Sequence, residues 1–272
     1  QTPASAEHNA RASKTLPLVS AGAKAAATPA EAVAGAEVVV TSLMDDQSVL
    51  DIVGGPGGIA AAMPKGAVHM CVTTISPECA NQLGEIHARA GTQFVSGPVA
   101  GRPDSAAAGQ LITFLGGDTD AIAAVTPVCS AYARKVVPLA GRPGLANAMK
   151  LCVNYTAVSI IELMGEIYTF GEKCGIDSKV IRDFFLDAFA HPALKTYANK
   201  LKDGRYGSEG GFALKAGLKD VRLMLDAASG VGVAFDIAKI VERKMVRALD
   251  QGMGQADWSV VATITRQESG LS

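Results

Sequence analysis

The chain has 272 residues, of which 49% are hydrophobic and 19% are charged. This length and apolar content predict two modest globular domains with sizeable cores, and they exclude an intrinsically disordered chain. The formal net charge is −1 and no run of lysine or arginine occurs, so the basic surface of a protein that binds nucleic acid or an anionic membrane is absent. A small soluble partner is expected instead.

The cysteines and histidines indicate neither a disulfide framework nor a metal site. The five cysteines are odd in number, lack CxxC spacing and mostly fall in apolar runs, which is typical of reduced thiols that pack as small apolar groups. They are Cys71, Cys79, Cys129, Cys152 and Cys174. The four histidines have no neighbouring His, Cys or carboxylate at ligand spacing. No leader-like segment or membrane-spanning apolar run is evident, so we expect a cytoplasmic protein without a metal.

The first half of the chain alternates short apolar or β-branched runs with alanine-rich helical stretches, which is the pattern of an α/β unit around a mostly parallel sheet. The predicted strands are residues 37–43, 67–73, 93–95, 111–115 and 135–139. Helix starts are marked by Thr28, which forms a capping box with Glu31, and by Ser76, each followed by proline. Gly91 is predicted to end the helix that Ser76 begins.

The second half is predicted to be helical. Residues 145–173 are apolar on most sides and Gly175 provides a stop, which indicates one helix about 40 Å long that can leave one domain and enter another. Strand signals then disappear, and amphipathic helices are predicted at residues 178–189, 192–201, 218–229 and 235–251. The predicted organisation is an α/β domain at 1–143, a long interdomain helix at 144–174 and an all-helical domain at 175–272.

Polar or glycine-rich turns follow three strands, at residues 43–46, 73–77 and 96–102. Ligands of open α/β sheets bind beyond the carboxyl ends of strands, so these turns are candidates for lining one cleft. Asp45 and Asp46 are expected to cap the following helix rather than to form an acid pair. Thr74 suits a ribose, a nicotinamide amide or a carboxylate, with helix capping by Ser76 as the alternative for this segment. Residues 97–101 suit an anion, with a tight ligand-free turn as the alternative.

Lys150, Asn154 and Asn147 lie at helical spacing near the start of the long helix, so their side chains project from one face. The presence of an ammonium and two amides on a mostly apolar helix requires an explanation, because burying an unpaired charge is costly. Catalysis is one reason, and a surface lysine with amide neighbours at a frayed helix end is the alternative. Lys219 and Asp220 are either an ordinary exposed pair on an amphipathic helix or part of a site.

Five segments, taken in order, resemble motifs of the β-hydroxyacid dehydrogenase family, which includes 3-hydroxyisobutyrate dehydrogenase, tartronate semialdehyde reductase and glyoxylate/succinic semialdehyde reductases. They are residues 73–77 (TTISP), 97–101 (GPVAG), 144–154 (GLANAMKLCVN), 218–220 (LKD) and 254–259 (GQADWS). The resemblance runs along nearly the whole chain. It implies an α/β Rossmann-like domain followed by an all-α domain, joined by a long interdomain helix. It also implies an NAD(P)-dependent oxidoreductase that interconverts a small 3-hydroxy acid and its semialdehyde.

The resemblance also implies roles for individual residues. Lys150 is the implied general acid that protonates the carbonyl oxygen as hydride arrives, and the base in the reverse direction, while Asn154 orients Lys150 or the substrate oxygen. The implied contacts to a small carboxylate substrate are Thr74, Ala100, Gly101, Arg102, Asn147 and Asp220. The implied cofactor contacts are Asn9, Arg11, Leu43, Met44, Thr74 and Lys219. A homodimer or homotetramer is expected, as the family usually forms.

The sequence departs from the family pattern at three positions within the five segments. Ala100 replaces the family's serine in the substrate loop, so the carboxylate contact is expected from backbone amides or from Arg102, and the substrate is expected to be unusual. Ala146 replaces a glycine before the catalytic lysine, which a helix start tolerates. Val153 replaces the first asparagine of a pair, so that only Asn154 remains to serve the site.

The G-x-G-x-x-G turn that holds the pyrophosphate in this family does not occur in the sequence. Residues 9–14 align with the turn after the family's second strand. We therefore expect either that a piece of the natural protein precedes Gln1, which we favour, or that cofactor binding has been damaged. Members that prefer NADP carry arginine where this chain has Ala10, with Arg11 one place later, so NADP is only slightly favoured over NAD.

Two alternatives stay open. One is an imine reductase-like enzyme, but that related group generally lacks lysine at the catalytic position, so Lys150 favours the hydroxyacid reaction. The other is a non-catalytic dimeric scaffold that has lost cofactor binding. The absence of the glycine-rich turn favours the scaffold, and the presence of both Lys150 and Asn154 opposes it.

Overall fold

The computed structural model describes residues 6–7, 15–188, 192–207 and 211–271, and the chain divides into two compact units. The first unit comprises Gln1–Gly101 and Ala106–Lys150, and the second comprises Arg102–Ser105 and Leu151–Ser272. The division falls inside helix α8 (Gly144–Lys173). The boundaries drawn from the sequence lie instead at the two ends of this helix.

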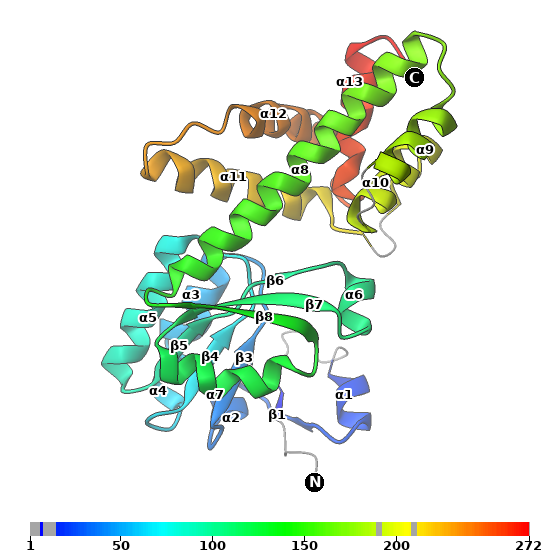
Figure 1. The fold of residues 1–272 in the computed structure, drawn as a ribbon. Helices are drawn as coiled ribbons and strands as arrows, with labels where there is room; N and C mark the ends of the chain where they lie inside the picture. Colours follow the sequence, from blue (N-terminus) through cyan, green and yellow to red (C-terminus); the bar gives the residue numbers. More distant parts are fainter. Residues whose placement is uncertain (1–5, 8–14, 189–191, 208–210, 272) are drawn as a thin grey trace. The chain divides into compact units, whose positions relative to one another are not determined.

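The first unit is built on a six-stranded mixed sheet with the order β3-β4-β5-β7-β6, with β8 paired to β7 (Figure 1). Its strands are β3 (Val38–Thr41), β4 (Val68–Cys71), β5 (Gln93–Ser96), β6 (Val99–Ala100), β7 (Leu111–Gly117) and β8 (Ala133–Ala140). β3, β4 and β5 are parallel neighbours, whereas β7 runs antiparallel to β5 and β6. The prediction of a mostly parallel sheet is confirmed, and all five predicted strands are present.

Helices cover both faces of this sheet. The helices of the first unit are α1 (Leu16–Ser20), α2 (Pro29–Val33), α3 (Asp46–Gly54), α4 (Ile59–Ala62), α5 (Pro77–Ala90) and α7 (Thr119–Cys129), while α6 (Pro103–Ala107) is divided between the two units. One buried cluster joins α3, α4 and α5 to Cys71 and Phe94, while a second joins α7 to Met70 and Val95. Met70 and Cys71 are consecutive residues of β4, and Phe94 and Val95 are consecutive residues of β5, so the two clusters lie on opposite faces of the sheet.

The helix caps that the sequence marks at Thr28, Ser76 and Gly91 agree with the structure, with one correction. Ser76 accepts the backbone N–H of Cys79 at 3.0 Å, and Gly91 ends α5 in the left-handed conformation (φ 71°). Thr28 accepts the N–H of Glu31 at 3.2 Å, as predicted. The capping box predicted there is wrong, because the Glu31 carboxylate binds the N–H of Ala27 rather than that of Thr28.

The second unit is helical, as predicted, apart from one isolated β-bridge between Ala213 and Asp257. Beyond α8 its elements are α9 (Ser178–Ala188), α10 (Pro192–Asp203), α11 (Leu214–Gly230), α12 (Asp236–Asp250), a 3₁₀ turn (Trp258–Val260) and α13 (Val261–Glu268). α11 begins four residues before the predicted start, where Leu214 donates its N–H to Ala256. The core of this unit includes Met164, Met245 and Trp258.

The strands β1 (Ala6–Glu7), β2 (Lys24–Ala25) and β6 were not predicted, because two-residue strands carry no periodic signal. All five cysteines are free thiols. Cys71, Cys79 and Cys129 are buried as expected, whereas Cys152 and Cys174 are exposed. Within the described ranges, every helix is too short or too polar to cross a membrane.

Candidate functional site

Two of the three predicted turns are tied together at the carboxyl ends of β3 and β4. The N–H of Leu43 donates to Thr73 Oγ1 at 2.8 Å. Asp46 accepts both the N–H (3.0 Å) and the hydroxyl (2.5 Å) of Ser76. Asp45 caps α3 as predicted, but Asp46 links the starts of two helices instead of only complementing a helix dipole. The turns that follow β3 and β4 therefore form one connected edge.

Asn147 connects this edge to the turn after β5. It is fully buried, its Oδ1 accepts the N–H of Ile75 at 3.1 Å, and its Nδ2 donates to Ser96 Oγ at 2.6 Å. The N–H of Gly144 donates to Asn81 Oδ1 at 2.9 Å. The first turn of α8 is thus fixed against two of the predicted turns. Both ends of the Asn147 amide contact protein groups, and its predicted substrate contact stays a prediction.

Asn154 and Asp220, which were both predicted as site residues, are joined by a direct hydrogen bond. Lys150 is half-buried and lies one helical turn before Asn154 on α8. Asn154 Nδ2 donates to Asp220 Oδ2 at 2.6 Å, and Lys219 Nζ lies 2.8 Å from Asp220 Oδ1. Asp220 is 2% exposed, so the alternative of an exposed Lys219–Asp220 pair is wrong. With its N–H₂ held by a carboxylate, the Asn154 amide presents its oxygen as the acceptor.

The division of the chain into two units falls within the predicted substrate-binding residues 100–102. Ala100 lies in β6 opposite Ile112 of β7. Gly101 has φ 141°, a backbone conformation that residues with a Cβ rarely adopt. Ala100 and Gly101 belong to the first unit, whereas Arg102 belongs to the second. The glycine is therefore explained by the backbone turn that the loop makes before Arg102.

Arg102 lies beside a buried carboxylate in the second unit. Its Nη1 is 3.6 Å from Asp257 Oδ2, and Lys200 Nζ is 2.9 Å from the same oxygen. Burial alone would raise the pKa of Asp257, but the bonds from Ser259 and Lys200 lower it overall. Two cations thus contact one carboxylate, and one of them, Arg102, directly follows Gly101 in the sequence. Neither Lys200 nor Asp257 was predicted as a site residue.

Comparison with known proteins decides the family. A family model described as the NAD binding domain of 6-phosphogluconate dehydrogenase matches residues 6–141. A second family model, described as NAD-binding of NADP-dependent 3-hydroxyisobutyrate dehydrogenase, matches residues 144–265. The chain belongs to the β-hydroxyacid dehydrogenase family. It is an NAD(P)-dependent oxidoreductase, as predicted.

Similar proteins span nearly all of this dehydrogenase. An uncharacterized oxidoreductase, YfjR, of Bacillus subtilis is 30% identical over 93% of this chain and 88% of its own length. Glyoxylate/succinic semialdehyde reductase 1 of Arabidopsis thaliana is 28% identical over 93% of this chain and 87% of its own. In structure, 3-hydroxyisobutyrate dehydrogenase of Salmonella typhimurium has a TM-score of 0.83 at 23% identity and covers 95% of this chain and 90% of that one. The predicted fold class is confirmed.

The turns after β3 and β4 of this dehydrogenase fit a nicotinamide dinucleotide. Met44 is 67% exposed beside half-buried Leu43, so the first turn offers an apolar surface for a flat ring. Thr74 is half-buried just before α5 and offers a hydroxyl for a ribose or amide. Lys219, the other predicted cofactor contact, is in the second unit. Asn9 and Arg11 lie outside the described residues.

The supporting residues of this dehydrogenase were missed by sequence reasoning. Thr73, Asn81 and Ser96 hold the turns and the start of α8, but none was predicted as functional. Thr73 and Ser96 lie at the carboxyl end of a predicted strand, and Asn81 lies in the second turn of the helix that follows one. That position is the available signal, because polar groups buried there need partners.

Proposed function

We propose that this dehydrogenase interconverts a small 3-hydroxy acid and its semialdehyde, with Lys150 as general acid in reduction and general base in oxidation. The observation that supports this most is the placement of Lys150 one helical turn from Asn154, whose amide is held by buried Asp220 at 2.6 Å. The carboxylate sets the orientation of the amide, and the amide oxygen is then a fixed acceptor for the Lys150 ammonium or for the substrate hydroxyl.

The proposed step is balanced by one hydride and one proton. The reduced nicotinamide, when bound, supplies the hydride that adds to the carbonyl carbon. The Lys150 ammonium gives its proton to the carbonyl oxygen, so the aldehyde becomes a primary alcohol and Lys150 becomes a neutral amine. In the reverse direction the neutral amine takes the proton of the hydroxyl. Asn154 keeps the oxygen and the amine within hydrogen-bond distance, which is the geometric requirement of general acid catalysis.

The substrate carboxylate is proposed to bind at residues 100–102, with Thr74, Asn147 and Asp220 as the other substrate contacts. Ala100 has no hydroxyl, so the backbone N–H groups of Ala100 and Gly101 and the guanidinium of Arg102 are the donors in this proposal. A planar guanidinium suits a carboxylate, and Lys200 nearby supports a positive potential because it shares Asp257 with Arg102. Leu43, Met44, Thr74 and Lys219 are the proposed cofactor contacts.

We further propose a homodimer or homotetramer in the cytoplasm. Large apolar side chains of the second unit support the oligomer, because Leu163, Phe170, Val180 and Phe184 on α8 and α9 are each at least 51% exposed. Free thiols support a reducing compartment. Analytical ultracentrifugation at working concentration tests the oligomer, and a monomer would contradict it.

A panel of substrates tests the reaction. The enzyme is expected to oxidise NADPH or NADH in the presence of small carboxylates with a terminal aldehyde, and to leave simple cyclic imines unreduced. Turnover of cyclic imines without turnover of semialdehydes would instead establish the imine reductase alternative. Titration with each cofactor in the same preparation measures the preference between NADP and NAD.

A further inference from the structure

Asp257 is a fully buried carboxylate of the second unit and directly precedes the 3₁₀ turn Trp258–Val260. Its Oδ1 accepts both the N–H and the hydroxyl of Ser259. Its Oδ2 accepts the N–H of Phe212 at 3.1 Å and lies 2.9 Å from Lys200 Nζ. A carboxylate offers about four lone-pair positions to donors. Ser259, Phe212 and Lys200 therefore fill the acceptor capacity of this carboxylate.

Arg102 is the second cation of this carboxylate but does not hold a close position. Its Nη1 lies 3.6 Å from Asp257 Oδ2, whereas a charge-assisted hydrogen bond from a cation measures about 2.7–2.9 Å. The nearer position on the same oxygen belongs to Lys200. Asp104 lies 3.9 Å from Arg102 Nε, but its side chain is 76% exposed and water screens its charge. The guanidinium is thus attracted to Asp257 without a short hydrogen bond to it.

The position of Lys200 is set by helix α10. Tyr197 lies one turn before Lys200 on this helix, and its hydroxyl accepts the indole N–H of Trp258 at 3.0 Å. Both Tyr197 and Trp258 are buried. Since Trp258 follows Asp257 directly in the sequence, this bond holds the Lys200 face of α10 against the carboxylate. The contact between Lys200 and Asp257 therefore has a support that does not involve Arg102.

The charges of the cluster do not balance. Asp257 is ionised, because the bonds from Ser259 and Lys200 outweigh the effect of burial and lower its pKa. One negative charge thus faces two positive charges, those of Lys200 and Arg102. Because Lys200 is the closer partner, it neutralises most of the carboxylate charge, and the guanidinium keeps its attraction for a further anion. Without Lys200, an acceptor position on Asp257 Oδ2 would open for Arg102.

We propose that Lys200 sets the affinity of this dehydrogenase for its carboxylate substrate by occupying Asp257, which keeps Arg102 from closing on Asp257 and directs its guanidinium to the substrate. Lys200 and Asp257 are then positioning residues that act through Arg102 and do not touch the substrate. This inference rests on the proposed contact between Arg102 and the substrate carboxylate. Its distinctive consequence is that removing the Lys200 cation weakens substrate binding only while Arg102 is present.

The first experiment measures KM and kcat for semialdehyde reduction in Lys200→Met. The guanidinium is expected to close on Asp257 in this variant, so KM should rise about tenfold while kcat stays within about twofold of the wild type. Lys200→Arg keeps a cation at Asp257 and is expected to keep KM within about threefold of the wild type. Lys202→Met is the matched control, because Lys202 lies on the same helix and pairs with Asp203 at 2.9 Å, outside this cluster.

The second experiment asks whether the effect passes through Arg102. The ratio kcat/KM is measured for Lys200→Met, Arg102→Met and the double variant, which together form a double-mutant cycle. Arg102→Met alone is expected to lower kcat/KM at least as much as Lys200→Met does. In the double variant, Lys200→Met is expected to cost no more than about a further twofold. Single losses that multiply in the double variant would show that Lys200 acts independently of Arg102, and the proposal would be wrong.

The outcomes separate this inference from the proposed function. A wild-type KM in Lys200→Met together with a raised KM in Arg102→Met would overturn the role of Lys200 and leave the substrate contact of Arg102 standing. Unchanged kinetics in Arg102→Met would overturn that proposed contact, and this inference with it. A wild type that reduces no semialdehyde would overturn the proposed function as a whole.

Two controls keep the test decisive if Lys200→Met is unstable. Equal rises of KM in Lys200→Met and Lys202→Met would reflect a general loss of positive charge on α10 and would overturn the inference. If Lys200→Met does not fold, Lys200→Gln removes the charge but keeps a donor for Asp257. KM is again expected to rise in Lys200→Gln, about threefold or more, and a wild-type KM there would refute the role of Lys200.

Discussion

Helix α8 contributes to two buried polar clusters, and their difference separates chemistry from stability. Asn154 joins Asp220 and Lys219 of α11 in the first cluster. Two turns later, Glu162 joins Lys244 of α12 in the second. The Lys219 side chain is 26% exposed, whereas the Lys244 side chain is 5% exposed. The first cluster therefore keeps its lysine partly exposed to solvent, whereas the lysine of the second is buried.

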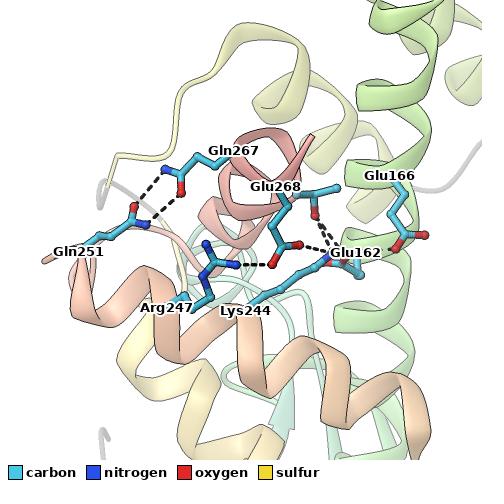
Figure 2. Close-up of polar contacts among 8 residues, drawn as sticks. Glu162, Glu166, Lys244, Arg247, Gln251, Gln267 and Glu268 are labelled. Atoms are coloured by element: carbon cyan, nitrogen blue, oxygen red, sulfur yellow. Dashed lines mark hydrogen bonds and ion pairs between the residues drawn. The ribbon is translucent and has the colours of Figure 1, made fainter. Parts of the chain in front are cut away.

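The hydrogen bonds of the Lys244 cluster come from side chains within the cluster, although Glu162 Oε2 is buried without a hydrogen-bond partner among the described residues (Figure 2). Lys244 donates to Glu162 and, at 2.8 Å, to Thr265 Oγ1, with Glu166 and Glu268 about as far away as an ion pair allows, at 3.9 and 4.0 Å. Burial raises the pKa of Glu162, although its bond with Lys244 opposes the shift. Such a pair adds little to the net free energy of unfolding. Breaking it is nevertheless costly, because removing one partner leaves a buried charge.

This contrast teaches that a buried ion pair is not by itself a functional signal. Both clusters combine a lysine with a carboxylate near α8, and only the neighbourhood distinguishes them. Asn154 lies one turn from Lys150 and within a motif shared with the family, whereas Glu162 lies among core side chains such as Ile161 and Met164. We therefore expect substitutions in the first cluster to change activity and substitutions in the second to change stability.

The largest expected effect is on catalysis at Lys150. Lys150→Ala is expected to lower kcat by roughly 10²- to 10⁴-fold while folding and cofactor binding are retained, because a general acid contributes about that much. Lys150→Arg is expected to fail similarly, since a guanidinium keeps its proton at neutral pH. Lys215→Ala, an exposed lysine on α11, is the matched control. Turnover in Lys150→Ala equal to that of the wild type would refute the assigned role.

The next effect is on stability at Lys244. Lys244→Met leaves Glu162 buried without its cation and is expected to lower the free energy of unfolding by about 3–5 kcal/mol, with kcat of the folded enzyme unchanged. The double variant Lys244→Met/Glu162→Met removes both charges and is expected to recover most of this loss. Denaturant titration of both variants measures the difference. A double variant as unstable as the single one would show that packing, not the unpaired carboxylate, is responsible.

A smaller effect concerns His87, which is buried and neutral rather than charged. The unfolded chain takes up a proton on this histidine below about pH 6.5, whereas the folded chain does so only near pH 4, so acidification favours unfolding. Between pH 7 and pH 5 this group alone is expected to lower the free energy of unfolding by about 2 kcal/mol. His87→Gln should lose that part of the pH dependence. Parallel stability curves for wild type and variant would contradict the assignment.

The smallest effect is expected at the rim of the Lys244 cluster. Gln251 and Gln267 are exposed and exchange two hydrogen bonds of 2.9 and 3.0 Å (Figure 2). Gln251→Ala is expected to change the free energy of unfolding by no more than about 0.5 kcal/mol, because water replaces these bonds. A loss as large as that of Lys244→Met would mean that the rim and the buried pair act as one unit.

Much of the fold could be predicted, because strands and helices carry local periodicity. All five predicted strands were confirmed, and the helical spacing correctly placed Lys150 and Asn154 one turn apart. Partners far apart in sequence could not be predicted in the same way. Lys244 and Glu162 are 82 residues apart, and each looks like an ordinary polar residue of an amphipathic helix.

The histidines illustrate the same limit within the first unit. His69 and His87 have no spacing that suggests contact, yet a strand and the end of the next helix bring their rings to a centroid distance of 4.9 Å. Asn147 was predicted as a substrate contact because it shares a face with Lys150. Its bonds to Ile75 and Ser96 depend on the fold of the two preceding turns, which one helix face does not reveal.

The most direct test of the account compares one substitution from each cluster in the same assay. Asp220→Asn and Glu162→Gln each remove a buried carboxylate charge, and both kcat for semialdehyde reduction and the free energy of unfolding are measured. We predict that Asp220→Asn lowers kcat by about tenfold or more through misplacement of Asn154, while Glu162→Gln leaves kcat of the folded enzyme within about twofold of the wild type. Wild-type kcat in Asp220→Asn, or loss of kcat in Glu162→Gln alone, would contradict the account.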